Sequence, residues 1–266
     1  AATRTAEARA KLTSLLPLLL VSLSEARNAD AALMRFDAFL ARLPAGVQLF
    51  ALLEAHEHLR RLLVDFMASA PRLSEEVRHR AHILDGLIDP AFPSEINRRA
   101  ALVGKVDGFL ADSVSYEDLI DRTRLIGQEQ KFLISAGLLS GTVQAVNAGR
   151  QFTALAETLL HRLFAAVRKE FAQSFGEVPG ARIALLAFGK MASAEMTATS
   201  DLDFILLYSV PPGVEQSDGR NALAPSPDFA RLTPRLIAAL SAPTATGVLY
   251  EPGRRLRPSG SPAPPR

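Results

Sequence analysis

Cysteine is absent from the 266 residues of this chain. Its absence excludes disulfides, a thiolate metal site and a cysteine nucleophile, and it agrees with a reducing, cytoplasmic compartment. Net charge is also small, because 30 Lys and Arg residues oppose 28 Asp and Glu residues, for a formal charge of +2. Such a balance gives no polyelectrolyte character, so we expect no nucleic-acid partner.

Long apolar runs are scarce as well. The run Leu15–Leu23 is shorter than the roughly 20 residues that cross a bilayer, and it contains Pro17. We therefore expect no membrane partner. The run could be mistaken for the apolar part of a secretory signal, but its pattern continues helically, so we expect no signal peptide. Because the chain does not begin with Met, we expect it to be a piece of a longer protein.

Hydrophobic residues make up 48% of the chain, enough for one large domain or two small ones. Apolar residues at helical spacing predict a helical bundle over residues 1–112. The expected helices are Ala6–Leu23, Asp30–Arg42, Val47–Ala68, one opened by Ser74 and broken at Asp89-Pro90, and Ser94–Leu110. The five histidines do not have the spacing of a metal site, and we interpret them as solvated or structural: His56, His58, His79, His82 and His161.

A different pattern begins after the bundle, and we predict a second domain over residues 113–260. Two long helices are expected at Ser115–Ala136 and Val143–Phe175, the first with Ser115 and Asp118 as an acidic relative of a capping box. Strand-like runs occur only after residue 180, so the predicted fold is α+β, mostly helical, with a small mixed sheet. A shorter helix is expected at Phe229–Ser241. Residues 261–266 are of low complexity and predict a disordered tail.

The stretch from Arg182 to Tyr208 carries the chemistry. A predicted strand, Ile183–Phe188, is followed by a turn of small residues, Gly189–Ser200, and by a second strand, Asp201–Tyr208. Period-two geometry places the carboxylates of Asp201 and Asp203 on the same side of that strand. Two adjacent acids repel unless a cation neutralises them, and oxygen ligands suit Mg²⁺. The alternative interpretation is a surface turn with two solvated acids.

Gly189 is followed by eleven residues and then by Asp201-Leu202-Asp203. This order resembles the nucleotidyltransferase superfamily that includes DNA polymerase β. Further segments resemble, in family order, the glutamine synthetase adenylyltransferase family, namely its C-terminal adenylylating half and the helical region before it. The segments are LPAGVQLF (43–50), RLSEEVRHRAHILDGLIDP (72–90), FLISAGLLSGTVQAVNAGRQFTALAE (132–157), AFGKMASAEMTATSDLDFILLY (187–208) and LYEPGRRLRPSG (249–260).

The resemblance implies an enzyme that transfers AMP from ATP to a tyrosine of glutamine synthetase, while the other half of the family's proteins removes that AMP by phosphorolysis. It implies Asp201 and Asp203 as catalytic residues that hold Mg²⁺. It implies ATP as the cofactor, bound by Gly189, Lys190, Ala192, Ser193, Arg255 and Arg257. Glutamine synthetase is the implied protein substrate, and the PII signalling protein is a candidate partner.

Two departures from the family pattern stand out. The phosphate turn has Ala192-Ser193 where the family usually has Gly-Gly or Gly-Ser. The final strand, expected at Gly247–Leu256, has Gly253 where the family has its third acid, and Pro252 beside it removes a strand donor. Beyond Gly260 we expect the resemblance to end. This copy is therefore expected to be impaired; the alternatives are a non-catalytic helical remnant of the enzyme and a nucleotidyltransferase with another substrate.

Overall fold

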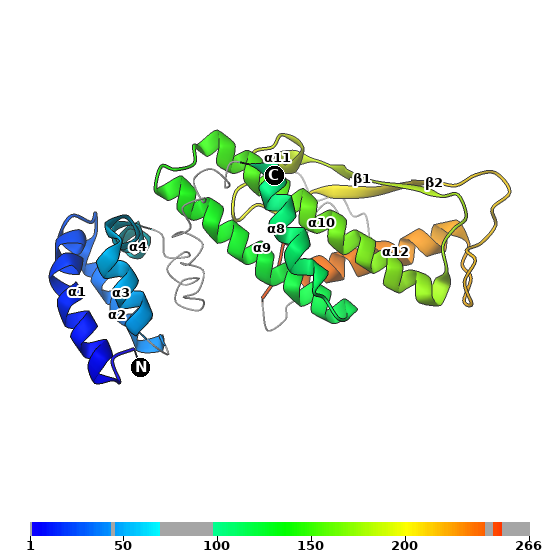
Figure 1. Cartoon of the computed structure of the whole chain (residues 1–266). Coiled ribbons are helices and arrows are strands. Elements are labelled where there is room, and N and C mark those ends of the chain that lie inside the picture. Colours follow the sequence, from blue (N-terminus) through cyan, green and yellow to red (C-terminus); the bar gives the residue numbers. More distant parts are fainter. Residues whose placement is uncertain (1, 44–45, 70–97, 243–246, 252–266) are drawn as a thin grey trace. The chain divides into compact units, whose positions relative to one another are not determined.

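The computed structural model describes residues 2–43, 46–69, 98–242 and 247–251. The chain divides into two compact units by its internal contacts. The first unit takes residues 1–97 and 132–144, and the second takes residues 98–131 and 145–266. Figure 1 follows the elements of both along the chain.

Helices are the only regular secondary structure in the described part of the first unit, as the sequence predicts for this region. Its own helices are α1 (Ala6–Ser24), α2 (Ala29–Arg42), α3 (Val47–Ala55) and α4 (Glu57–Ser69). They bury one apolar core, to which the last residues of α9 (Tyr116–Leu139) also contribute. Within this core, Phe66 of α4 meets Phe132 of α9 edge to face, with ring centroids 5.5 Å apart.

The single helix expected over Val47–Ala68 is wrong, because the chain leaves the helical conformation at His56, with φ −119° and ψ 94°. Because the helix ends here, the carbonyl of Leu53 does not receive the backbone N–H that a continuing helix would provide. The buried guanidinium of Arg60 supplies the missing donor, with Nη1 2.7 Å from that carbonyl. The helix expected from Ser74, its break at Asp89-Pro90 and the first residues of the helix expected from Ser94 lie outside the described residues.

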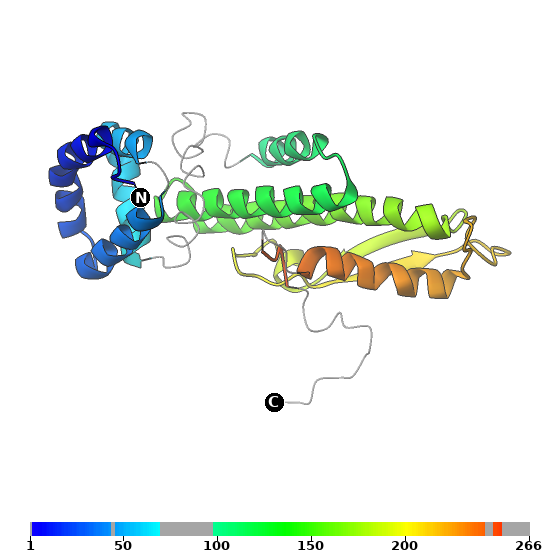
Figure 2. The same cartoon turned by 90° about the horizontal axis from the view of Figure 1, so that it is seen from below.

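The second unit is built on α10 (Ala145–Phe175), whose first half is buried almost all round. Against α10 pack α8 (Arg99–Ala111) and α12 (Pro225–Ser241), the latter visible along α10 in Figure 2. The strands β1 (Arg182–Ala187) and β2 (Phe204–Ser209) pair antiparallel, with the one-turn helix α11 (Gly189–Ala192) between them in sequence. The mostly helical α+β class is confirmed. The described sheet is this antiparallel pair rather than a mixed sheet, and half of the third expected strand, Gly247–Leu256, lies outside the described residues.

The sequence predicts a boundary between the domains at residue 112, which would assign α8 to the first domain. Two ion pairs attach α8 to α10: Arg162 holds Asp107 through two contacts of 2.7 Å, and Arg99 lies 2.6 Å from Glu157. These contacts join α8 to the second unit, which begins at residue 98. The tail expected at residues 261–266 lies outside the described residues.

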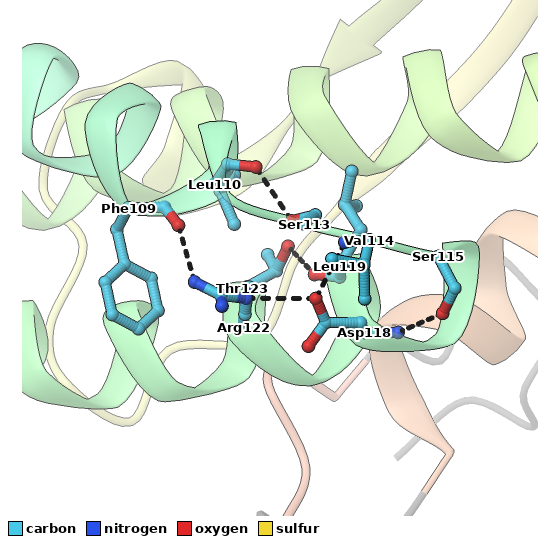
Figure 3. Close-up of polar contacts among 9 residues, drawn as sticks. All are labelled: Phe109, Leu110, Ser113, Val114, Ser115, Asp118, Leu119, Arg122 and Thr123. Atoms are coloured by element: carbon cyan, nitrogen blue, oxygen red, sulfur yellow. Dashed lines mark hydrogen bonds and ion pairs between the residues drawn. The ribbon is translucent and has the colours of Figure 1, made fainter.

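The corner between α8 and α9 contains a capping arrangement of Ser115 and Asp118 (Figure 3), which differs from the predicted capping box in that Asp118 accepts from Val114 rather than from Ser115. The Asp118 N–H donates to Ser115 Oγ at 3.1 Å, and the Val114 N–H donates to Asp118 Oδ2 at 3.0 Å. Arg122 donates to the same carboxylate oxygen and to the carbonyl of Phe109. The hydrogen bond from the Val114 N–H lowers the pKa of the Asp118 carboxyl, and Arg122 lowers it further. The corner is therefore fixed by local hydrogen bonds at the start of α9.

Candidate functional site

The turn between the two strands begins at Gly189, and Asp203 lies directly against it. The Phe188 N–H donates to the Asp203 carbonyl at 2.7 Å, which extends the β1–β2 pairing by one bond. Gly189 has a φ of +54°, which residues with a side chain rarely adopt. A Cβ at this position would also lie 2.8 Å from Asp203 Oδ2. Glycine therefore satisfies both the backbone conformation and the close approach of the carboxylate.

The stretch from Asp201 to Phe204 alternates in burial as a strand does. Leu202 and Phe204 are 0% and 2% exposed, whereas Asp201 is exposed and Asp203 is half-buried. This alternation agrees with the prediction that the two acids share one side of the chain. The regular strand begins only at Phe204, so the expected start at Asp201 is corrected by three residues. The two acids lie just before the strand, beside the turn.

The turn itself uses part of its hydrogen-bonding capacity internally. The N–H groups of Ala192 and Ser193 donate to the carbonyls of Phe188 and Gly189, at 3.3 and 3.2 Å. The Ser193 hydroxyl donates to Glu195 Oε2 at 3.0 Å. The amides of Gly189 and Lys190 belong to the first turn of α11, where helical geometry provides no acceptor within the helix. Among the expected phosphate ligands, these two amides are therefore better placed than those of Ala192 and Ser193.

Gly149 of α10, which the sequence analysis did not single out, allows this turn to pack closely against the helix. A Cβ on Gly149 of α10 would lie 3.1 Å from the Ala194 carbonyl oxygen and 3.3 Å from Glu195 Cα. Ala194 itself has a φ of +57°, an uncommon conformation for a residue with a side chain. The buried side chains of Met191 and Met196 anchor the same segment on either side. A glycine within an otherwise well-packed helix is the sequence signal that indicates such a close approach.

The chain returns to the two acids at its described C-terminal end. The Leu202 N–H donates to the Glu251 carbonyl at 3.0 Å, so residues 249–251 lie beside the Asp201–Asp203 segment. Lys131 of α9 holds them in place: its Nζ lies 2.7 Å from the Leu249 carbonyl and 3.5 Å from the centre of the Tyr250 ring. Burial raises the pKa of the Tyr250 phenol. The resemblance assigns the family's third acid to Gly253, two residues after Glu251.

Four of the residues discussed in the sequence analysis, Pro252, Gly253, Arg255 and Arg257, lie outside the described residues. Within the described ranges, no three His, Asp or Glu side chains gather as metal ligands. His56 and His58 are exposed, as expected of solvated side chains. His161, expected to be structural, is exposed as well, and His79 and His82 fall outside the described residues. No described helix is long and apolar enough to cross a membrane.

Comparison with known proteins identifies the family. A model of the glutamate-ammonia ligase adenylyltransferase family matches residues 60–265, so the likeness continues past Gly260, where we expected it to end. Over 263 residues, or 99% of this chain, 50% of positions are identical to a bifunctional glutamine synthetase adenylyltransferase/adenylyl-removing enzyme of Brucella melitensis. Proteins of the same name from Mesorhizobium japonicum and Agrobacterium fabrum are each 47% identical, over 98% and 99% of the chain.

These matches cover most of the present chain but only 27% of the length of each of the three relatives. The family match covers the whole of the turn and the two acids as well as the helices α8 to α10 that support them. The chain therefore belongs to the glutamate-ammonia ligase adenylyltransferase family.

Proposed function

We propose that this chain is part of an adenylylating domain that transfers AMP from ATP to a tyrosine of glutamine synthetase. The observation that carries the proposal is the contact between Gly189 and Asp203, which brings a carboxylate against the backbone at the start of the turn of small residues. The names of the relatives support glutamine synthetase as the protein substrate. The PII signalling protein remains a proposed partner through the family resemblance alone.

Asp201 and Asp203 fit the ligand chemistry of Mg²⁺, which takes one or two carboxylates together with phosphate oxygens of a nucleotide. Their shared side and their position beside the turn support this role. When bound, Mg²⁺ would neutralise the charge of the triphosphate and acidify the attacking hydroxyl. The chain's own contribution is to orient the nucleotide through the amides of Gly189 and Lys190, with Arg255 and Arg257 as further proposed contacts to ATP.

Gly253 sets the expected level of activity. The Leu202–Glu251 hydrogen bond brings the chain alongside the two acids just before this residue, but glycine supplies no carboxylate there. We infer that the chain binds Mg²⁺–ATP through Asp201 and Asp203 and transfers AMP poorly. This residue is also the observation that favours the second candidate function, a non-catalytic helical remnant of the enzyme.

The test is whether the purified chain binds ATP in the presence of Mg²⁺. Titration calorimetry measures this binding with and without EDTA. We expect binding in Mg²⁺ that EDTA abolishes. A chain that binds no ATP in either condition would contradict the nucleotide site and favour the remnant. Labelling of glutamine synthetase from labelled ATP distinguishes the protein substrate, and a label that stays on a small molecule would indicate a different nucleotidyltransferase.

A further inference from the structure

A cavity of about 590 Å³ opens between α9, α10 and α12, within the second unit. Its volume falls in the range of roughly 300–1,000 Å³ that is typical of small-molecule pockets. The residues that line it come from 116–124, 167–175 and 235–242, and not from the stretch 189–203. The proposed nucleotide site therefore leaves this cavity unused.

Arg124 is the deeply buried cation of the cavity, with only 1% of its surface exposed. Its Nη2 donates to the carbonyls of Ala239 and Ala242, each at 2.9 Å. These carbonyls belong to the end of α12, where a helix has carbonyl groups without backbone partners. Capping α12 thus explains the position of the guanidinium, but it uses only one of the three nitrogens.

The other two nitrogens of Arg124, Nε and Nη1, have no hydrogen-bond partner among the described residues. Asp121 Oδ1 lies 3.8 Å from Nη1, which allows an ion pair but is too long for a hydrogen bond. Buried donors without an acceptor are costly, and a charged group is costlier than a neutral one. A guanidinium held in a cavity in this way has the donors to bind an anionic acceptor.

The walls of the cavity are suited to an apolar body. The rings of Phe171 and Phe175 stack with centroids 4.6 Å apart, and both line the cavity. The guanidinium of Arg235 lies over both rings, at 4.8 and 5.2 Å from their centres. The ligand would therefore meet aromatic and aliphatic surface on one side and the donors of Arg124 on another.

Two further acids decide how much negative charge the ligand can carry. Glu117 and Glu170 also line the cavity, and Asp121 lies beside Arg124. These carboxylates would repel a phosphate chain or any other polyanion. Arg235 adds a second guanidinium over the aromatic wall, so the lining holds two cations and three carboxylates. The unused donors of Arg124, the apolar walls and this excess of acids together favour a ligand with a single negative charge.

We propose that this cavity binds a small organic monocarboxylate, whose carboxylate accepts hydrogen bonds from Arg124 and whose apolar body lies against Phe171 and Phe175. The proposal does not depend on the nucleotide site, because the two share no residue.

The test uses benzoate as the probe and the whole 266-residue chain, with binding measured by protein-observed NMR. Arg124→Met removes the donors and keeps an apolar stem of similar length. Because this variant also uncaps α12, a second variant, Ala238→Leu, narrows the cavity from its exposed lining and leaves Arg124 in place. The matched control is Ala165→Leu, at an alanine of α10 that is also exposed and lies outside this cavity.

We expect benzoate to bind to the parent chain. Arg124→Met should weaken that binding about tenfold or more because it removes a charge-assisted hydrogen bond, and Ala238→Leu should weaken it by a similar factor because it fills part of the cavity. Ala165→Leu should bind benzoate as the parent chain does, and inorganic phosphate and benzylamine should not shift the cavity resonances. The proposal is overturned if benzoate does not bind, if Ala238→Leu binds it unchanged, or if phosphate binds as tightly as benzoate.

Discussion

The carboxylate of Asp203 lies so close to Gly189 that a Cβ at residue 189 would come within 2.8 Å of Asp203 Oδ2. The contact joins the two ends of the turn that the family resemblance assigns to nucleotide binding. The φ of +54° at Gly189 is part of the same contact, because this conformation brings the backbone of residue 189 and the carboxylate together. The first two predictions follow from this pair of residues.

Gly189→Ala should destabilise the chain and weaken its Mg²⁺-dependent binding of ATP. The substitution costs about 1–2 kcal/mol for the left-handed conformation alone, and the new methyl group must displace Asp203. Gly213→Ala is the matched control, because Gly213 has a φ of +84° and open space around its Cβ position. Urea unfolding and ATP titration of both variants measure the two effects. Equal loss of ATP binding in the two variants would show that the contact with Asp203 is irrelevant.

Asp203→Asn should abolish Mg²⁺-dependent ATP binding while leaving the fold intact. The amide keeps the shape of the side chain beside Gly189 but removes the charge that a cation requires. The control is Glu215→Gln, which removes a like charge from an exposed position of the same unit. Calorimetric titration with ATP in Mg²⁺ gives the answer. If Asp203→Asn binds ATP as the parent chain does, the assignment of this carboxylate to a metal is wrong.

The sequence predicts the local features of both units better than their long-range contacts. Helical spacing gives α2 and α10 to within two residues at each end, because apolar residues that recur at the helical period are enough to specify a helix. The break at His56 is not predicted, since the stretch around it keeps a helical pattern and the compensating donor comes from Arg60 on the next helix. The role of Gly149 depends on Ala194, a residue far away in the sequence. Such contacts exist only in the folded chain.

Gly149 and Gly104 provide a test of that long-range contact. Both are glycines inside helices, but a Cβ at Gly104 would meet nothing within 4 Å, whereas one at Gly149 would lie 3.1 Å from the Ala194 carbonyl oxygen. Gly104→Ala should therefore raise the free energy of unfolding by about 0.5–1 kcal/mol. Gly149→Ala should show no such gain and should be about 1 kcal/mol or more less stable than Gly104→Ala. Equal gains in chemical unfolding would mean that the turn does not rest on α10.

The ion pair between α8 and α10 should make stability depend on pH. Hydrogen bonds from Arg162 lower the pKa of the Asp107 carboxyl in the folded chain. Around that pKa the unfolded chain binds more protons, so this contribution is present above the unfolded value of about 4 and is lost as pH falls through the folded one. Because both side chains are partly exposed, Asp107→Asn should cost at most about 1 kcal/mol near neutral pH.

The measurement is the free energy of unfolding of Asp107→Asn and of the parent chain, at neutral pH and in acid. The difference between them should vanish in acid, where the parent carboxyl is protonated. Asp112→Asn, at an exposed position that ends the same helix, should show no comparable loss at neutral pH. A difference that persists unchanged in acid would mean that charge plays no part in the Asp107 contact.

Gly253→Asp should increase transfer of AMP to glutamine synthetase. The Glu251 carbonyl accepts from the Leu202 N–H between Asp201 and Asp203, and the family resemblance assigns the third acid to residue 253, so the substitution is expected to extend the set of carboxylates from two to three. A lost metal ligand at such a site costs several kcal/mol of transition-state stabilisation, which corresponds to roughly 10³-fold in rate. The variant should recover part of that factor, limited by Pro252, which cannot donate to a neighbouring strand.

The assay for this variant follows label from ATP to glutamine synthetase, with Gly213→Asp as a control that adds the same charge at an open position. The double variant Pro252→Val with Gly253→Asp separates the strand donor from the acid. We expect the parent chain and Gly213→Asp to label weakly, Gly253→Asp to label faster and the double variant to label fastest. ATP binding should change little across the series, because Asp201, Asp203 and the turn are untouched. Rapid labelling by the parent chain would show that Gly253 does not impair the site, and the inferred need for a third acid would then be wrong.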